Sequence, residues 1–216
     1  SHSSQRRYKT VLLFHGITSD QVDDIEEDTA MNRLVDPLDF ILLAPYSRRL
    51  AIEWDQGRPG DNPDVALMDD LFTCAKTRLG SDPDRLYLAG DSGGGMFVTF
   101  LISQFAETVA AAAINSGGII FDLPNSNAKK MPVIYGWGGD CDVSRGQDFS
   151  VFAQDVIPKL KSNGHLVASC NHDTGHEWKP MFTPWFLQFL FAHELNSPSP
   201  FEMGMTGDFP EFCTLD

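Results

Sequence analysis

Short apolar runs alternate with amphipathic stretches along most of the chain. The apolar runs have the length of buried β-strands and end at glycine, proline or polar residues; they cover residues 11–14, 40–44, 85–89, 110–115, 133–137 and 165–170. The amphipathic stretches repeat apolar side chains at the spacing of an α-helix; they cover residues 64–79, 96–105, a segment from 149 onward and 183–194. We expect Pro158 to kink or shorten the third of these helices.

This alternation predicts an α/β fold, with a mostly parallel sheet and helices on both of its faces. Strands that are covered on both sides are apolar along their whole length, as these runs are. No internal repeat is present, and a length of 216 residues is typical of one domain. We therefore expect a single domain over residues 1–216, in which residues 197–216 form an irregular C-terminal tail on the surface.

The chain is acidic, with a formal net charge of −14 and an ordinary globular share of 42% hydrophobic residues. A nucleic-acid partner is not expected, because such binding depends on Lys and Arg that displace counterions. Adsorption to anionic membranes is disfavoured for the same reason, and no apolar run reaches the ~20 residues that cross a bilayer. The sequence gives no indication of the oligomeric state.

The sharpest chemical signal is Gly90-Asp91-Ser92-Gly93-Gly94, between a predicted strand and a predicted helix. A chain that turns from strand to helix in one step forces Ser92 into a strained conformation and needs small residues beside it. The turn exposes the serine oxygen above the carboxyl ends of the strands, and the Gly93 amide lies at the start of the helix. We therefore predict that Ser92 is a nucleophile; the alternative is a Gly-Ser loop without chemistry.

The same five letters also surround the nucleophile of trypsin-like proteases, which consist of two β-barrels. Those enzymes place the histidine far upstream, usually in an Ala-Ala-His-Cys stretch, and the aspartate between histidine and serine. Here the upstream histidines are His2 and His15, neither lies in such a stretch, and strands alternate with helices. The sequence therefore favours a strand-turn-helix hydrolase over a trypsin-like protease.

A serine hydroxyl needs a base and an acid that orients the base, and strand-turn-helix hydrolases place them in the order Ser, Asp or Glu, His. An apolar strand at 131–137 leads into a glycine-rich loop with Asp140 and Asp142, either of which could orient the histidine. A calcium-binding EF-hand loop here is excluded, because its glycine would fall at Arg145 and its glutamate at Val151.

Three downstream histidines compete for the role of the base: His165, His172 and His176. His165 would lie at the start of its strand, at the wrong edge of the sheet. His172 is the second choice and fits a supporting or structural role. His176 follows Gly175, which lets the loop turn back over the strand ends, so we predict that His176 is the base.

A second amide for the oxyanion normally comes from the loop after the first long strand. Here that loop is Phe14-His15-Gly16-Ile17-Thr18. We predict that the amides of Ile17 and Gly93 form the oxyanion hole, with Thr18 as the next choice after Ile17. Loss of one such donor typically costs about 3 kcal/mol of transition-state stabilisation. His15 is expected to hold the loop.

Four cysteines allow three pairings; they are Cys74, Cys141, Cys170 and Cys213. They contain no CxxC pair, so a zinc site is not expected. The cysteines are compatible with disulfides in a secreted protein and with free thiols in a cytoplasmic protein. Of these two alternatives we favour the secreted, extracellular location.

The chain resembles the α/β-hydrolases, within the esterase group that contains polyhydroxybutyrate depolymerases, feruloyl esterases and acetylxylan esterases. The stretch Ser81-Asp-Pro-Asp-Arg-Leu-Tyr-Leu-Ala-Gly-Asp-Ser-Gly-Gly-Gly-Met96 is similar to the DPxRxYxxGxSxGGxM run of that group. Further matches are Asp64-Val65-Ala66, Leu12-Leu-Phe-His-Gly16, Asn115-Ser-Gly-Gly118, the Trp137-Gly-Gly loop and Gly175-His176. They extend from about Val11 to His176, which is most of the domain.

The resemblance implies an α/β-hydrolase fold and favours one of the two candidate acids. Val143 has the offset from Asp140 that the usual acid loop of the group shows, whereas the Trp-Gly-Gly form of the loop in small relatives points to Asp142. We prefer Asp142 and keep Asp140 as the alternative. The chain is short, so we expect a minimal cap or none and an open cleft; Trp54, Trp137 and Trp178 either line it or belong to the core.

These residues together predict a serine hydrolase that cleaves carboxylic esters through an acyl-enzyme, with Ser92, Asp142 and His176 as its triad. Such chemistry needs no metal and no cofactor. The partner is a small-molecule or polymer ester, with acetyl, feruloyl and polyester bonds as candidates. The alternatives are a serine peptidase on the same fold and a non-catalytic binding protein that keeps the hydrolase fold.

Overall fold

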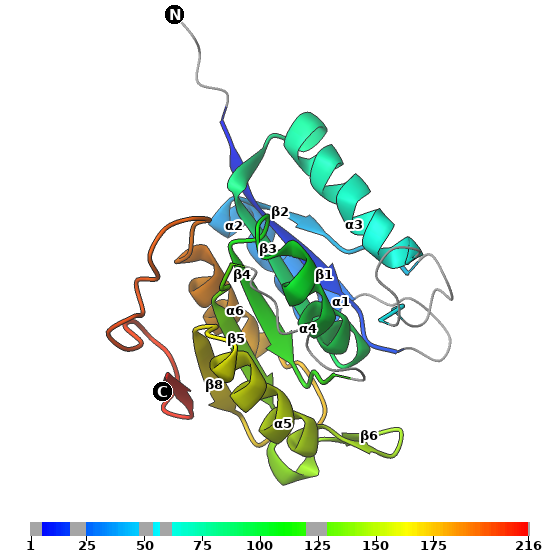
Figure 1. The fold of residues 1–216 in the computed structure, drawn as a ribbon, viewed down its shortest axis with the longest axis vertical. Coiled ribbons are helices and arrows are strands. Elements are labelled where there is room, and N and C mark those ends of the chain that lie inside the picture. Colours follow the sequence, from blue (N-terminus) through cyan, green and yellow to red (C-terminus); the bar gives the residue numbers. More distant parts are fainter. Residues whose placement is uncertain (1–5, 18–24, 48–53, 57–61, 120–128, 216) are drawn as a thin grey trace, which may run out of the picture.

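The computed structural model describes residues 6–17, 25–47, 54–56, 62–119 and 129–215. Within them, seven strands form one sheet in the order β2-β1-β3-β4-β5-β8-β9 (Figure 1). Their bounds are β1 (Tyr8–Phe14), β2 (Phe40–Leu43), β3 (Ser81–Asp91), β4 (Ala111–Asn115), β5 (Val133–Trp137), β8 (Val167–Asn171) and β9 (Cys213–Leu215). The first six pair in parallel and β9 is antiparallel to β8, which confirms a mostly parallel sheet.

Helices cover both faces of this sheet (Figure 1). The α-helices are α1 (Ile25–Asp28), α2 (Val35–Leu38), α3 (Pro63–Cys74), α4 (Gly93–Phe105), α5 (Phe149–Ser162) and α6 (Thr183–Phe191). One apolar core lies between the sheet and α3, α4 and α5, and a second lies between the sheet and α1 and α6. Strand residues alternate between the two cores, since Leu12 and Phe14 belong to the first and Val11 and Leu13 to the second.

Shorter elements connect these helices and strands. They are η1 (Met31–Leu34), η2 (Ala75–Leu79), η3 (Gly139–Cys141), η4 (Pro180–Phe182), β6 (Val143–Ser144) and β7 (Gln147–Asp148). The strands β6 and β7 form a hairpin directly after Asp142. Its two turn residues, Arg145 and Gly146, both have positive φ angles, as a tight two-residue hairpin requires.

Two expectations about local structure are corrected. Helix α5 is not shortened by Pro158 but continues to Ser162. Pro158 and Gln154, four residues earlier, are both exposed, so water can bond to the Gln154 carbonyl that the proline leaves without a donor. The segment after Ser197 is not irregular throughout, because β9 joins the sheet at its end.

The topology sets where a site can form. The chain passes from β1 to β2 on one side and then returns to β3 on the other side of β1. Ligands of open α/β sheets bind at such a reversal, beyond the carboxyl ends of the strands. The loop after β1 and the turn after β3 therefore meet where a site is expected. No helix in the described residues is long and apolar enough to cross a membrane.

Candidate active site

Ser92 occupies the whole turn between β3, which ends at Asp91, and α4, which begins at Gly93. Its backbone angles, φ 54° and ψ −120°, are sparsely populated by residues with a side chain and cost about 1–3 kcal/mol. The surroundings hold this conformation, because the Ser92 amide donates to the Asn115 carbonyl over 3.0 Å. A Cβ atom on Gly94 would lie only 2.1 Å from the Phe14 carbonyl oxygen. The turn therefore has the strain and the small neighbour that the sequence predicts.

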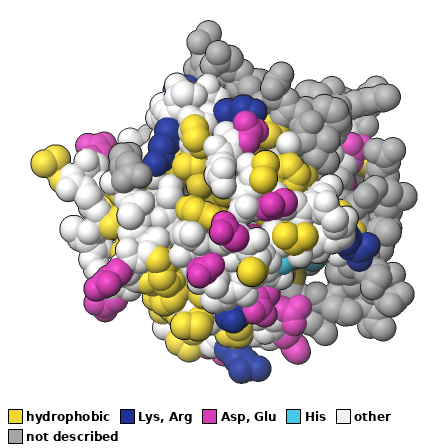
Figure 2. Space-filling model, turned by 90° about the horizontal axis from the view of Figure 1, so that it is seen from below, with side chains coloured by type: hydrophobic (Ala, Val, Ile, Leu, Met, Phe, Trp, Pro, Cys, Tyr) yellow, Lys and Arg dark blue, Asp and Glu magenta, His cyan; other side chains and the backbone are white. Residues whose placement is uncertain are grey.

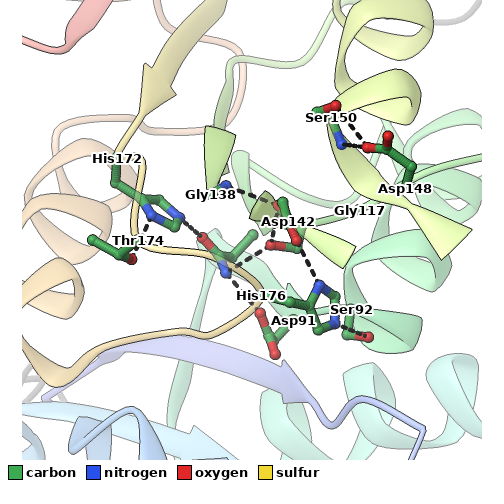
Figure 3. Close-up of polar contacts among 12 residues, drawn as sticks. Asp91, Ser92, Gly117, Gly138, Asp142, Asp148, Ser150, His172, Thr174 and His176 are labelled. Carbon is green, nitrogen blue, oxygen red and sulfur yellow. Dashed lines mark hydrogen bonds and ion pairs between the residues drawn. The ribbon is translucent and has the colours of Figure 1, made fainter. Parts of the chain in front are cut away.

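Three side chains from distant parts of the sequence form a continuous hydrogen-bonded line at this turn (Figure 3). His176 Nε2 lies 2.8 Å from Ser92 Oγ, and His176 Nδ1 lies 2.6 Å from Asp142 Oδ1. An ionised carboxylate can only accept, so His176 carries its proton on Nδ1 and turns the lone pair of Nε2 toward the serine hydroxyl. This is the tautomer that a general base needs.

The carboxylate of Asp142 is fully buried and has donors on both oxygens. Besides His176, the Ser116 hydroxyl and the Gly138 amide each donate to Oδ2 over 2.8 Å. The ring of Phe149, the first residue of α5, packs on the imidazole at a centroid distance of 4.3 Å. Together, these contacts hold the Asp142 carboxylate and the His176 imidazole in one orientation.

Ser116 is a residue of the site that the sequence did not single out for a role. It follows β4 directly and has a positive φ angle of 44°. The available signal was its position, since Ser116 comes immediately after a buried strand that ends at Asn115, at the same edge of the sheet as β3. Its use as a donor to Asp142 depends on a loop that lies 26 residues further along the chain.

The alternative acid and bases lie elsewhere. Asp140 is exposed in η3, two residues before Asp142. His165 precedes β8 and contacts the backbone of Met131, which is the amino-terminal edge of the sheet, as expected. His172 is buried, and this burial lowers the pKa of its imidazole to about 4. Of the candidates, the structure brings Asp142 and His176 to Ser92.

The two predicted oxyanion donors lie next to each other. A Cβ atom placed on Gly93 would lie 3.2 Å from the Ile17 amide nitrogen, and one placed on Gly16 would lie 3.6 Å from Ser92 Oγ. The loop after β1 therefore runs along the first turn of α4, beside the serine hydroxyl. His15 is buried and its Nδ1 donates to the Gly16 carbonyl over 2.7 Å. Thr18 lies outside the described residues.

Asp91, directly before the serine, is a second carboxylate at the site. Burial raises its pKa to about 6, although donation from the Asn115 amide over 2.7 Å and the neighbouring His176 both act in the opposite direction. Asp142 and Asp28 add to the rise because they are negative charges. The charge of Asp91 therefore changes near pH 6.

One disulfide lies close to the loop that carries the histidine. Cys170 of β8 is bonded to Cys213 of β9, whereas Cys74 and Cys141 are free thiols. The bond joins the directly opposite positions of the two strands and precedes His176 by six residues. Among the described residues, no group of three His, Cys, Asp or Glu side chains could hold a metal ion.

The surface at the carboxyl ends of the strands combines apolar and acidic side chains. Figure 2 looks onto this face from below Figure 1 and shows both kinds close to a histidine that reaches the surface. Exposed apolar residues here are Ile17 after β1, Val143 in β6 and Val151 in the first turn of α5. Trp54 and Trp178 are only 5% exposed and belong to the cores, so of the three tryptophans only the half-buried Trp137 can border an open cleft.

Comparisons with known proteins connect this geometry to esterases. No protein-family model matches the sequence. The chain is 27% identical over 215 residues, 95% of its length, to the bifunctional acetylxylan esterase/xylanase XynS20E of Neocallimastix patriciarum, and it spans 31% of the length of that protein. Any activity that the chain shares with this relative is therefore a proposal.

Solved structures show the same fold at low sequence identity. The crystal structure of native pOPH has a TM-score of 0.72 at 17% identity, covering 99% of this chain and 87% of that one. A carboxylesterase from Mesorhizobium loti has a TM-score of 0.68 at 18% identity, covering 87% of this chain and 90% of that one. With its parallel sheet and its single-residue turn at Ser92, the chain has the α/β-hydrolase fold.

Proposed function

We propose that this protein is a serine hydrolase that cleaves carboxylic esters through an acyl-enzyme. The observation that carries the proposal is the hydrogen-bonded line from buried Asp142 through His176 to Ser92, at a strained turn on the carboxyl edge of the sheet. The esterase names of the curated relative and of a structural neighbour support the same chemistry. Neither identity is high enough to carry the activity by itself.

The geometry accounts for each proton in the reaction. As Ser92 Oγ attacks the ester carbonyl, its proton moves to His176 Nε2, 2.8 Å away. The imidazolium that forms is stabilised by the Asp142 carboxylate, and the amides of Gly93 and Ile17 face the negative oxygen of the tetrahedral intermediate. The intermediate collapses when His176 returns the proton to the leaving alcohol. Water then attacks the acyl-enzyme by the same steps, with His176 as base, and releases the acid.

We further propose that the natural substrate is a short acyl ester on a carbohydrate, with acetyl as the first choice. Its support is the curated relative, an acetylxylan esterase/xylanase. Feruloyl and polyester bonds are the other candidates within the same chemistry. A panel of p-nitrophenyl esters of increasing chain length, together with acetylated xylan and methyl ferulate, separates them. Acetate release from the polysaccharide at a higher kcat/KM than ferulate release supports the first choice.

The disulfide supports a location outside the cytoplasm. Bonds such as Cys170–Cys213 form and persist in oxidising compartments and are rare in the cytoplasm. We therefore propose that the protein is secreted. The intact mass of protein isolated from its native source, with and without reduction, tests whether this bond is present there.

The decisive experiment combines a covalent probe with a substrate. A fluorophosphonate probe should label the wild-type protein once, and Ser92→Ala should abolish both the labelling and the hydrolysis of p-nitrophenyl acetate. Absence of labelling in the folded wild-type protein would identify a binding protein that keeps only the fold. A higher kcat/KM for short peptide amides than for esters would identify a peptidase.

A further inference from the structure

A second hydrogen-bonded line runs behind the line of Asp142, His176 and Ser92, and the proposed reaction does not use it directly (Figure 3). It begins at Thr174, whose Oγ1 lies 2.9 Å from His172 Nδ1. His172 Nε2 lies 3.1 Å from Asn115 Oδ1. The Asn115 amide then lies 2.7 Å from Asp91 Oδ1 and 3.3 Å from Ser116 Oγ.

The donors and acceptors along this line are determined by its two ends. Carboxylates accept only, so the Asn115 NH₂ group faces Asp91 and the Asn115 oxygen faces His172. His172 therefore carries its proton on Nε2, and its Nδ1 accepts from the Thr174 hydroxyl. The Ser116 hydroxyl accepts from Asn115 and donates to Asp142 over 2.8 Å.

Asn115 connects the segments that carry the proposed triad. Its backbone carbonyl accepts from the Ser92 amide, and its side chain contacts Asp91 and Ser116. His172 connects Asn115 to the loop of His176, and the His172 amide also donates to the carbonyl of Trp137, at the start of the acid loop. The imidazole of His172 is 7% exposed and packs on the ring of Phe182 at 4.4 Å.

We propose that His172, through Asn115, is a positioning residue that holds the Asp142 and His176 loops in register with Ser92. The proposal rests on the esterase function proposed above. Its physical basis is that His172 Nε2 makes a directed hydrogen bond to Asn115, on the strand that supports the acid, while Thr174, in the loop that bears the base, holds the other side of the ring. A side chain that only filled space could be replaced by another ring without effect on turnover.

Four variants test the proposal. His172→Phe keeps a ring against Phe182 and removes both hydrogen bonds. His172→Gln places an amide N–H near the position of Nε2 and restores the donor to Asn115. Thr174→Val removes only the hydroxyl that selects the tautomer of His172. The matched control is His193→Phe, at the other end of the sheet.

His193 suits this control because, like His172, it is buried, makes a hydrogen bond through each ring nitrogen and packs on an aromatic ring. It is 3% exposed, its Nδ1 contacts the Phe189 carbonyl at 2.8 Å, and its Nε2 contacts Ser199 Oγ at 2.7 Å. Its ring packs on Phe189 at 4.6 Å. The substitution therefore removes the same kinds of contact as His172→Phe without touching the site.

The measurement is kcat for p-nitrophenyl acetate, per site labelled by a fluorophosphonate, together with KM and the unfolding temperature. We expect His172→Phe to lower kcat per labelled site about 10- to 100-fold, the cost of a displacement of about 1 Å, and to leave KM within about threefold. His172→Gln should recover most of the loss, and His193→Phe should change only the unfolding temperature.

An unchanged kcat per labelled site in His172→Phe, or an equal loss in His193→Phe, would overturn the proposal. If His172→Phe does not fold, Thr174→Val tests the proposal instead. We then expect kcat per labelled site to fall about threefold or more, and an unchanged value would overturn the proposal. Failure of the proposed function has a different signature, since the wild-type protein would then lack labelling or hydrolysis.

Discussion

Replacing Asp142 with asparagine changes one atom of the side chain and removes its charge. Gly138 N–H and the Ser116 hydroxyl both donate to Oδ2. The backbone N–H cannot reverse its direction, so the asparagine oxygen must take this side and its NH₂ group must face His176. The imidazole then accepts at Nδ1 and carries its proton on Nε2, where it cannot take the proton of Ser92.

The expected loss follows from this change of tautomer. The same substitution in the Ser-His-Asp triad of a protease lowers kcat about 10⁴-fold, which is about 5 kcal/mol in the activation free energy. Here the buried carboxylate has three donors, and the asparagine keeps two of them, so the protein should still fold. We expect a loss of about 10⁴-fold in kcat with KM within about threefold, because the side chain does not touch the substrate.

The assay compares kcat and KM for p-nitrophenyl acetate in Asp142→Asn and Asp140→Asn. Asp140→Asn removes the same charge from an exposed side chain two residues before Asp142. It should retain kcat within about twofold. Ser92→Ala provides the background rate. A kcat above one tenth of the wild-type value in Asp142→Asn, or an equal loss in Asp140→Asn, would show that Asp142 does not orient the base.

Three further predictions concern stability. Ser92→Gly should be more stable to urea than Ser92→Ala by about 1 kcal/mol, because glycine avoids the 1–3 kcal/mol strain of φ 54° at some cost in entropy; equal stability would contradict the strain. Replacing Cys170 and Cys213 together by serine should lower the free energy of unfolding by about 4 kcal/mol, because the bond closes a loop of 43 residues and so reduces the entropy of the unfolded chain. The control Cys74→Ser should change this free energy by less than about 1 kcal/mol. Burial raises the pKa of Asp91 to about 6, above its unfolded value, so ionisation of Asp91 destabilises the fold as the pH rises from 4 through 6. Asp91→Asn should therefore raise the free energy of unfolding by up to about 3 kcal/mol at pH 8 and by little at pH 4. A gain that does not depend on pH would refute this.

Local patterns were enough to predict the six parallel strands, the helices α3 to α6 and the sharp turn at Ser92. Each of the six parallel strands overlaps an apolar run, because strands covered by helices on both faces are mostly apolar. The turn at Ser92 could be found because adjacent residues determine it, with glycines required by close backbone approach. The local rules failed at Pro158, where the exposed position leaves the free carbonyl accessible to water and the helix continues, and at β9.

The relations between distant segments were decided by the tertiary structure alone. The sequence left Asp140 and Asp142 open, since they are two residues apart; only the η3 turn exposes one and buries the other beside His176. It gave no role to Ser116. It also left open which cysteines pair, whereas the structure has the bond between Cys170 and Cys213. The reason is physical: the pattern of side chains along a segment reports its burial and its local geometry. Which hydrogen bonds form depends on distances between segments that are far apart in the sequence, 84 residues for Ser92 and His176, and the order of the strands in the sheet determines those distances.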